Sequence, residues 1–481
     1  MAGIGFALRT LMRKDTLWAI FESMLHGIIA VAGPWFFTII GMALPALLFT
    51  SAESKSVTDQ FVTILLYVFS VSLTLTSPVA IGLTRHVSDC LYQKRESEIS
   101  ASLIGAVFLC FLCASPVAIF GMVYLDLPFE IRVLTLFSYG LVTMNWIVAP
   151  MLSTIRQFRA LTLAYALGTL IFWLTIRGQH RISTAELLVG FNLGVCVTNA
   201  LICGLVLHSF PGQTWPSKRL LQSMMRYWDL LLGGLLYGAG IWVDKWLMWT
   251  APEHSELAGG LVTYPTYDTV AFLAYVTTVP AMALFIIEAE TSFHQSCRQL
   301  YDLIQEHAAL QTLNRARLNT IDVFRATCRD VAFLQICITA LVLLLPTLLL
   351  DALGVAHSGV FMFRFCALGA AFQLGVMILS IGLHYFDSRR TILQINALFL
   401  AANALFTWLA LRVGLRWYGF GYFIAGLTTF VVAYWLMTVT FRDMLYLAFV
   451  RQNAAVTQAS AHAVTETQWF AAVTAPRDGT K

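Results

Sequence analysis

The sequence predicts an all-α polytopic membrane protein of about twelve transmembrane helices, arranged as two lobes of about six helices each. Hydrophobic residues make up 58% of the chain and charged residues only 12%, whereas soluble domains carry about 25% charged residues. Apolar runs of about twenty residues, the length that crosses a bilayer as a helix, recur along the chain. Short motifs of the first half also return in the second half.

Each predicted span is an apolar run that is long enough to cross hydrocarbon and that carries few charges. In chain order the spans cover 17–49, 61–83, 103–125, 133–155, 160–176, 187–207, 230–249, 270–287, 331–350, 360–383, 392–411 and 419–441. The fifth run is the shortest. The loops expected on the outer side are short, so they leave no room for a catalytic domain there.

The segment 1–16 precedes the first span and has the pattern of a short interfacial helix. Ile4, Leu8 and Leu11 share one helical face, and basic residues lie among them. The apolar stretch that follows is about thirty residues long, which exceeds the roughly 7–15 residues of a signal-peptide core. We therefore expect this segment to lie on the membrane and to be retained.

The distribution of basic residues predicts the orientation. Of the 30 Lys and Arg residues, few lie in the loops of one side, namely Lys55, Arg132, Arg177, Arg181, Arg412 and Arg416. Most of the others lie on the opposite side, and loops rich in Lys and Arg stay in the cytoplasm. Both termini are therefore expected in the cytoplasm. The net charge of +4 reflects this bias and gives no reason to expect a nucleic-acid partner.

The two halves of the chain share short motifs. AGPW at 32–35 in the first span returns as AGIW at 239–242 in the seventh. A proline lies late in the next span of each half, at Pro78 and Pro280. Six helices per half with the same starting side form a parallel repeat, an architecture of transporters whose substrate path lies between the halves.

This repeat predicts a first lobe at 17–227 and a second lobe at 228–443. The second lobe contains an insertion at 288–330 whose apolar residues follow helical spacing. The insertion is either a solvated continuation of the eighth span or a docking surface for a cytoplasmic partner. The segment 444–481 is rich in Ala, Thr and Gln, and we expect a cytoplasmic tail that is mostly disordered.

Asp244 and Lys245 are adjacent charges inside the seventh span. Charged side chains inside a membrane are costly, so they usually face a bundle interior or a wet cavity. One hypothesis is that the pair forms a polar or proton-linked part of a central substrate path. The alternative is a pair near the outer interface, with Lys245 reaching water. Adjacent helix positions lie about 100° apart, so both side chains cannot point straight at one cavity.

Glu22, His26 and Arg364 are further polar candidates for the substrate path. Glu22 and His26 lie one helical turn apart in the first span, and histidine titrates near neutral pH, so the pair could relay a proton. Alternatively, Glu22 lies in the inner headgroup region and only caps the span. Arg364, at the start of the tenth span, either attracts a sugar hydroxyl or carboxylate or anchors the helix at the interface.

Three tryptophans are aromatic candidates for the same path, because sugar rings stack on flat aromatic rings. Trp35 and Trp242 occupy equivalent places in the predicted repeat, each near a glycine, and Trp246 lies one turn further along the seventh span. We predict that these three side chains contact the substrate. Most other tryptophans are expected in the interfacial belts of a membrane protein.

Sequence motifs of several enzyme classes are missing. There is no G-x-x-x-x-G-K-[ST] loop for ATP phosphates, and neither G-x-S-x-G nor H-E-x-x-H occurs. Cys110 and Cys113 form a CxxC inside an apolar run, without a second pair or a nearby histidine. We therefore expect a protein that is not an enzyme, with no catalytic residues, no cofactor, no metal site and no disulfide framework.

Several stretches together resemble a known family: MAGIGF at the start, AGPW, GIWVDKWLMW, and YDTVAFLAYVTTVPAMALFIIEAETSF. They are similar to PelG, the inner-membrane transporters of the Pel exopolysaccharide system, in the polysaccharide-transporter branch of the MOP flippase superfamily. The resemblance covers roughly residues 1–445 and implies a two-lobed MOP/MATE-like fold in the bacterial inner membrane. It also implies export of a galactosamine-rich polymer to the periplasm, with a cytoplasmic glycosyltransferase and cyclic-di-GMP-sensing membrane proteins as partners.

We therefore predict export of an exopolysaccharide without an ATPase of its own, with membrane lipid and the polysaccharide as direct contacts. A lipid-linked oligosaccharide flippase or a cation or drug antiporter of the same architecture is the alternative. An integral membrane enzyme is disfavoured, because beyond His26 no intramembrane histidine with a positioned partner is evident. A scaffold without transport would leave the charges inside the seventh span unexplained.

Overall fold

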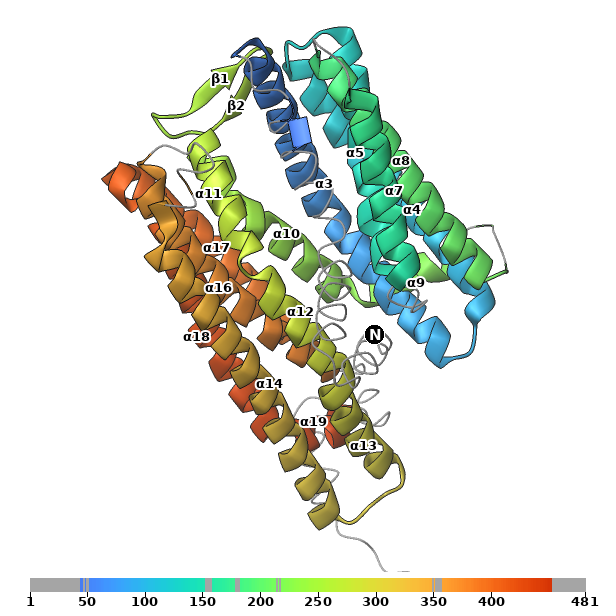
Figure 1. Ribbon diagram of the computed structural model, residues 1–481. Helices are drawn as coiled ribbons and strands as arrows, with labels where there is room; N and C mark the ends of the chain where they lie inside the picture. Colours follow the sequence, from blue (N-terminus) through green and yellow to red (C-terminus); the bar gives the residue numbers. More distant parts are fainter. Residues whose placement is uncertain are drawn as a thin grey trace, which may run out of the picture.

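The computed structural model describes residues 44–45, 48, 52–151, 158–177, 182–212, 215, 218–347, 350 and 357–451. The helices form two elongated bundles that lie side by side (Figure 1). The predicted interfacial helix 1–16, almost all of the predicted first span and most of the predicted tail lie outside the described residues. The fold is all-α and spans the membrane several times, as the sequence predicts.

The first bundle consists of long helices from the first half of the chain. They are α3 (Ala52–Tyr92), α4 (Ile99–Tyr124), α5 (Phe129–Val148), α7 (Phe158–Ile176) and α8 (Thr184–Ser209). Each coincides with one predicted span, although α3 is longer than its apolar run. Short 3₁₀ turns, η1 (Glu96–Glu98) and η2 (Ala149–Met151), join neighbouring helices, and the amphipathic helix α9 (Lys218–Arg226) leads to the second half.

The second bundle begins with α10 (Trp228–Met248). It continues with α11 (Pro265–Val276), α12 (Val279–Glu288), α14 (Leu310–Leu344), α16 (Gly359–Tyr385), α17 (Arg389–Val413), the 3₁₀ turn η4 (Leu415–Trp417) and α18 (Phe420–Arg442). The predicted span 270–287 is divided between α11 and α12, and the division falls just before Pro280, which cannot donate a helical hydrogen bond. The other predicted spans of this half each coincide with one helix.

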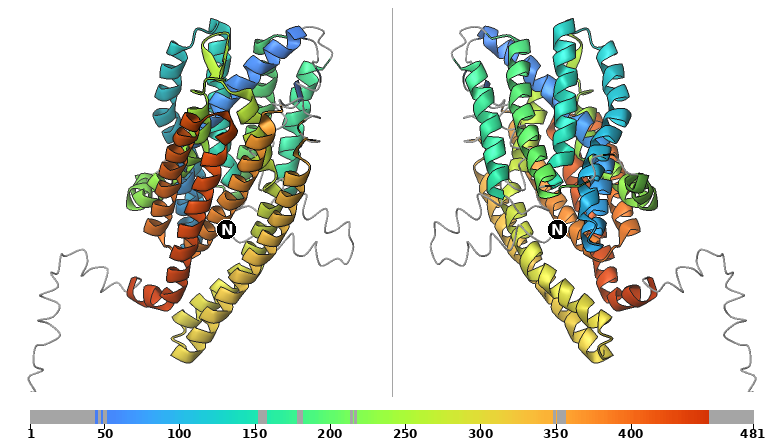
Figure 2. Two further views of the ribbon diagram at one scale, coloured as in Figure 1. Left: turned by 90° about the vertical axis from the view of Figure 1, so that its left-hand side faces the viewer. Right: turned by 90° about the vertical axis from the view of Figure 1, so that its right-hand side faces the viewer.

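The predicted insertion 288–330 is helical. A π-helical turn, η3 (Ala289–Phe293), and helix α13 (His294–Gln305) extend α12, and the first half of α14 returns antiparallel to them. Phe293, Cys297 and Leu300 are buried along this hairpin, where Phe293 packs on Phe324 of α14 with ring centroids 4.9 Å apart. The hairpin extends beyond the other helices at one end of the molecule (Figure 2), and α19 (Met444–Arg451) lies at the same end.

A two-stranded antiparallel hairpin, β1 (Ser255–Leu257) and β2 (Leu261–Thr263), lies at the opposite end. Its turn contains Gly259, with φ +89°, and Gly260, with φ +74°, backbone conformations that favour glycine. A Cβ on Gly259 would lie 2.4 Å from Leu127 of the first bundle. The Asp126 N–H donates to the Gly259 carbonyl at 3.1 Å. This hairpin therefore bridges the two bundles at the end where the charge bias predicts the outer side.

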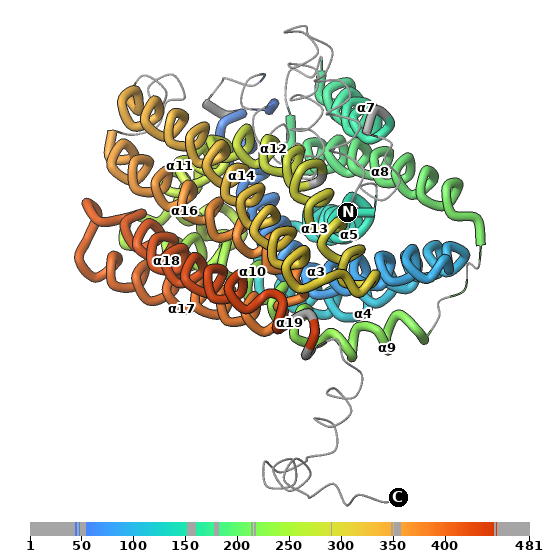
Figure 3. Tube along the Cα trace, turned by 90° about the horizontal axis from the view of Figure 1, so that it is seen from below, coloured from blue at the N-terminus to red at the C-terminus, as the bar shows by residue number. Residues whose placement is uncertain are grey.

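The two bundles meet along α3 and α10, which lie side by side between the outer helices (Figure 3). Small residues allow this approach. A Cβ on Gly234 would lie 3.2 Å from the Ser77 carbonyl oxygen, and one on Gly238 would lie 3.0 Å from the Thr74 Cα. Glycine faces of this kind let transmembrane helices pack through their backbones.

Among the described residues, nine helices are long and apolar enough to cross a bilayer, and Ala160–Ile176 is a shorter apolar helix. Helix α10 is not one of these nine, and its 21 residues include the buried, adjacent charges Asp244 and Lys245. These charges lie on the helix that forms the second bundle's side of the contact with the first bundle. Among the described residues, the buried pair Asp244 and Lys245 thus lies on a helix at the contact between the two bundles.

Candidate functional site

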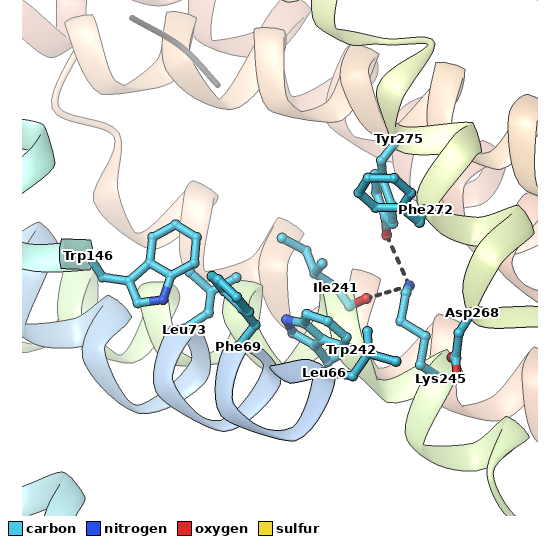
Figure 4. A pocket seen from close by; sticks show the side chains of 10 residues that line it. All are labelled: Leu66, Phe69, Leu73, Trp146, Ile241, Trp242, Lys245, Asp268, Phe272 and Tyr275. Atoms are coloured by element: carbon cyan, nitrogen blue, oxygen red, sulfur yellow. Dashed lines mark hydrogen bonds between the residues drawn. The ribbon is translucent and has the colours of Figure 1, made fainter. Parts of the chain in front are cut away.

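A small cavity lies between the two bundles (Figure 4). The first bundle contributes Leu66, Phe69 and Leu73 from α3 and Trp146 from α5. The second bundle contributes Ile241, Trp242 and Lys245 from α10, and Asp268, Phe272 and Tyr275 from α11. The cavity measures about 30 Å³, which is room for about two water molecules and not for a sugar ring.

Lys245 reaches this cavity and is bound on several sides. Its Nζ lies 3.0 Å from both carboxylate oxygens of Asp244, donates to the Ile241 carbonyl at 2.9 Å, and lies 3.4 Å from the Tyr275 hydroxyl. Only 5% of Lys245 is exposed. The ammonium is therefore held inside the protein by an ion pair, and it does not reach outward to water.

Aromatic rings surround the same ammonium group. The Nζ of Lys245 lies 4.8 Å from the centroid of Tyr275, 5.7 Å from that of Tyr422 and 5.8 Å from that of Trp242. Ring faces attract cations, and the attraction grows when the cation is desolvated. These three rings come from α10, α11 and α18, so the cation joins three helices of the second bundle.

Asp244 is completely buried and does not line the cavity. Besides Lys245, its carboxylate accepts hydrogen bonds from the Tyr267 hydroxyl at 2.9 Å and from the Asn403 side-chain amide at 3.4 Å. These hydrogen bonds and the opposite charge of Lys245 offset the free energy that it costs to bury the Asp244 carboxylate. Thus the two side chains meet in an ion pair, but of the two only Lys245 lines the cavity, and they do not both point straight into it.

Trp242 lines the cavity and has an indole N–H without a hydrogen-bond acceptor among the described residues. Its indole N–H is buried, and no residue that the structure describes accepts its hydrogen bond. By contrast, the Trp146 indole N–H on the opposite wall donates to the Ser72 hydroxyl at 3.2 Å. A buried donor without a partner costs roughly 1–3 kcal/mol. The Trp242 N–H therefore has a reason to bind a water or a hydroxyl group in the cavity.

Asp268 is a carboxylate on the cavity wall, and the sequence motifs do not single it out. It accepts hydrogen bonds from the Thr263 hydroxyl at 2.9 Å, the Trp249 indole N–H at 3.1 Å and the Tyr264 backbone N–H at 3.3 Å. Among the described residues it forms no ion pair. Trp249 also stacks on Tyr67 of the first bundle at 4.6 Å. In the sequence, Asp268 resembles an ordinary acidic residue in the first turn of a helix.

Two asparagines of α17 hold α10 in place, and these too escape the sequence motifs. The Asn396 amide donates to the Gly233 carbonyl at 3.0 Å, and the Asn403 amide donates to the Gly240 carbonyl at 2.9 Å. Asn403 thereby fixes the turn of α10 that precedes Asp244. The sequence does indicate this contact through the spacing of the two asparagines. They lie seven residues apart in NALFLAAN, which places both on one helical face.

The other predicted path residues lie elsewhere. Trp246 is partly buried against the first hydrophobic core and does not line the cavity. Arg364 is exposed on α16, away from the cavity. Glu22, His26 and Trp35 lie outside the described residues, so the proton relay and the equivalence of Trp35 with Trp242 stay predictions. The structure thus brings together Trp242, Lys245 and its partner Asp244.

An ion-pair cluster joins the two bundles at the end where the charge bias predicts the cytoplasm. The Tyr227 ring lies between the guanidinium groups of Arg85, at 4.9 Å, and Arg389, at 5.1 Å, and its hydroxyl donates to Asp89 at 3.2 Å. Arg85 of the first bundle lies 3.8 Å from Asp387 of the second. Together with the β-hairpin, this inner cluster closes the molecule at both ends of the α3–α10 contact.

His86, Cys90 and Glu98 form a buried group whose ligand atoms lie within 4.8 Å of one another. The Cys90 sulfur is 3.5 Å from the His86 Nε2. Arg219 donates to one Glu98 oxygen, and Arg95 lies 3.1 Å from the other. Because two guanidinium groups already neutralise this carboxylate, we interpret the group as an ion-pair site and assign it no metal.

Comparison with known proteins places the chain. The family model PelG, an exopolysaccharide exporter (EPS-E), matches residues 1–449. The fold is similar to an outward-facing MATE family multidrug resistance transporter of the MOP superfamily, with a TM-score of 0.61, 12% identity, and coverage of 87% of this chain and 96% of that one. The fold is also similar to a MOP superfamily transporter from Pyrococcus furiosus, with a TM-score of 0.60, 12% identity, and coverage of 92% of this chain and 97% of that one. None of the curated proteins matches the sequence.

Proposed function

Since the chain belongs to the PelG family of exopolysaccharide exporters and has the fold of a MOP transporter, we propose that it moves a Pel-type, galactosamine-rich polysaccharide across the bacterial inner membrane. The path runs between the two bundles, along α3, α10 and α11. Both termini lie in the cytoplasm, as the positive-inside bias requires.

The observation that carries this proposal is the unpaired indole N–H of Trp242 in a cavity with aromatic walls. A sugar presents hydroxyl groups along its edge and apolar C–H groups on its faces. The N–H of Trp242 supplies a donor for a hydroxyl, and Trp146, Phe69 and Tyr275 supply rings for the apolar faces.

The charges around the cavity suit an amino sugar. Counted at formal charges, Asp244 and Asp268 supply two carboxylates against the single ammonium of Lys245. Asp244 is neutralised by Lys245 at 3.0 Å, whereas Asp268 is bound only by neutral donors among the described residues. Asp268 is therefore the group that attracts the amino group of a galactosamine unit. This attraction supports a galactosamine polymer over a neutral one.

Transport requires the bundles to move, because the cavity is too small for a sugar ring in this conformation. The β-hairpin and the inner cluster around Tyr227 act as the outer and inner closures, which open in turn. The sequence has no P-loop motif, so we propose that synthesis of the polymer by a cytoplasmic glycosyltransferase, or an ion gradient, supplies the energy. The α13–α14 hairpin is the surface that such a partner would contact.

The test is a matched pair of substitutions on α10. Trp242→Phe keeps an aromatic ring and removes the N–H, and Trp246→Phe makes the same change outside the cavity. In cells that depend on this chain for export, we expect Trp242→Phe to lower the released polysaccharide about fivefold, the effect of one hydrogen bond worth about 1 kcal/mol. Trp246→Phe should stay within twofold at equal protein level. Equal export by the two variants would overturn the proposed sugar contact.

The alternatives of the same architecture give different results. Reconstituted protein that takes up small organic cations under a proton gradient, without the glycosyltransferase, would indicate a cation or drug antiporter. Movement of a lipid-linked oligosaccharide between leaflets would indicate a flippase. Dependence of transport on the co-expressed glycosyltransferase is the result that we expect for polymer export.

A further inference from the structure

A second and larger cavity opens on the surface of the second bundle, between α14, α16 and α18. It measures about 1010 Å³ and is separate from the cavity around Lys245. Its walls are mostly apolar and include Ala332, Leu343 and Phe430, but four arginines also line it: Arg317, Arg325, Arg329 and Arg442. A long apolar groove with several cations has the make-up of a site for an amphiphile.

The four arginines gather where these helices reach the predicted cytoplasmic surface. Arg442 ends α18, and Arg317 of α14 donates to its carbonyl oxygen at 2.9 Å. Phe324, next to Arg325, packs on Phe441 with centroids 5.5 Å apart, so Arg325 lies at the same level. One turn deeper lies Arg329. The groove is thus basic at its inner end and apolar towards the membrane centre.

Three of these arginines also have acidic neighbours. Arg325 lies 3.7 Å from Asp322, Arg329 lies 2.9 Å from Asp330, and Arg442 lies 3.1 Å from Asp443. These pairs are exposed and therefore contribute little stability. The three acidic residues do not line the groove, whereas all four arginines do. Since each guanidinium has five N–H donors, donors remain for a phosphate.

The surroundings of the groove indicate lipid. Phe333, Ile336 and Leu344 of α14 are exposed apolar side chains, as expected for a helix that faces hydrocarbon. Basic pockets between transmembrane helices on the cytoplasmic side bind anionic lipid headgroups. We propose that this groove binds an anionic glycerophospholipid of the cytoplasmic leaflet. Its phosphate lies among the four arginines, and an acyl chain lies along α14, filling the space between α14 and α18.

The headgroup half of the proposal is tested by native mass spectrometry of the purified full-length protein with phosphatidylglycerol or phosphatidylcholine. The variant is Arg325→Gln/Arg329→Gln. The control is Arg298→Gln/Arg315→Gln, two exposed arginines of the same hairpin that do not line the groove. We expect the wild type and the control to retain phosphatidylglycerol, and the groove variant to retain about tenfold less. Equal retention by both variants, or equal retention of both lipids, would overturn the proposal.

The proposed position of the acyl chain is tested by substitutions that fill the apolar part of the groove. Ala332→Trp places a ring in it, whereas Cys337→Trp places one on the exposed side of α14 away from it. Only Ala332→Trp should lower phosphatidylglycerol retention. If inorganic phosphate at the same concentration displaces the lipid, the site binds a free anion; if the groove variants instead abolish a dimer, the occupant is a second copy. Either result contradicts the lipid assignment.

Discussion

Both bundles are held together by asparagines that lie seven residues apart on one helix. In the second bundle these are Asn396 and Asn403, described above. In the first bundle they are Asn192 and Asn199 of α8, whose amides donate to the carbonyls of Leu134, at 3.1 Å, and Leu141, at 2.8 Å, on α5. In each case the two acceptors are also seven residues apart, so the paired helices run parallel and in register.

We call each pair of asparagines, with the hydrogen bonds that it donates to the neighbouring helix, a ladder. The two ladders differ in the charge of the side chains that bond to the asparagines. In the first bundle the partners are neutral: the Ser138 hydroxyl donates to Asn192 at 2.7 Å, and the Asn145 amide donates to Asn199 at 2.9 Å. In the second bundle the ladder ends at an ion pair, because Asn403 also donates to Asp244. Neutral amides and hydroxyls are thus sufficient to hold transmembrane helices together.

We propose that this difference separates the residues needed for stability from those needed for transport. If hydrogen bonding were the only need, the second bundle would use neutral residues, as the first does. A buried ion pair is weak evidence for stability, because desolvation offsets most of the attraction between the charges. We therefore propose that the charges of Asp244 and Lys245 have a role other than packing.

The largest effect is expected at the ion pair. Asp244→Asn leaves the Lys245 ammonium without its counter-charge, and removing one partner of a buried pair costs about 3–5 kcal/mol. Thermal unfolding of the purified protein should show this loss. The double variant Asp244→Asn/Lys245→Met removes both charges, so it should regain most of the stability and still fail to export polysaccharide. Wild-type export by the double variant would show that the pair serves packing alone.

A smaller effect is expected at the ladders themselves. Asn403→Leu and Asn199→Leu each remove one amide that donates to a backbone carbonyl, and each should lower stability by about 1–2 kcal/mol. Only Asn403→Leu also loosens Asp244, so only this variant should reduce export at equal protein level. The comparison fails if both variants reduce export to the same degree.

The smallest effect is expected at the hydroxyl groups that support the asparagines. Thr407 donates to Asn403 at 3.2 Å in the second bundle, as Ser138 does to Asn192 in the first. Thr407→Val and Ser138→Ala should each lower stability by no more than about 1 kcal/mol and leave export within twofold. Unfolding curves and export assays run side by side check this. If Ser138→Ala strongly reduced polysaccharide export, the first ladder would also be required for transport.

Much of this architecture is predictable from the sequence, but the composition of the site is not. The second and later predicted spans coincide with helices, and the pair at Asp244 and Lys245 is conspicuous in an apolar run. Asp268 and Asn403 are equally close to the site and were missed. Each is an ordinary polar residue within its own segment, and its importance depends on a partner on another helix.

The seven-residue spacing of the asparagines is the sequence signal of these helix contacts. NLGVCVTN in α8 and NALFLAAN in α17 both place two amides on one helical face. These helices are the sixth and eleventh predicted spans, so the motif does not follow the predicted six-helix repeat. The pattern indicates a polar helix contact, but it does not identify the helix that is contacted.

By itself, the sequence determined that this protein consists of membrane-spanning helices. Without water, backbone groups must pair within each helix, so length and apolar character suffice. Only the tertiary structure decided that Lys245 faces a cavity while Asp244 turns to Tyr267 and Asn403, and that the Trp242 N–H has no described partner. These contacts depend on how each helix is rotated and shifted against its neighbours, which the pattern of a single helix does not specify.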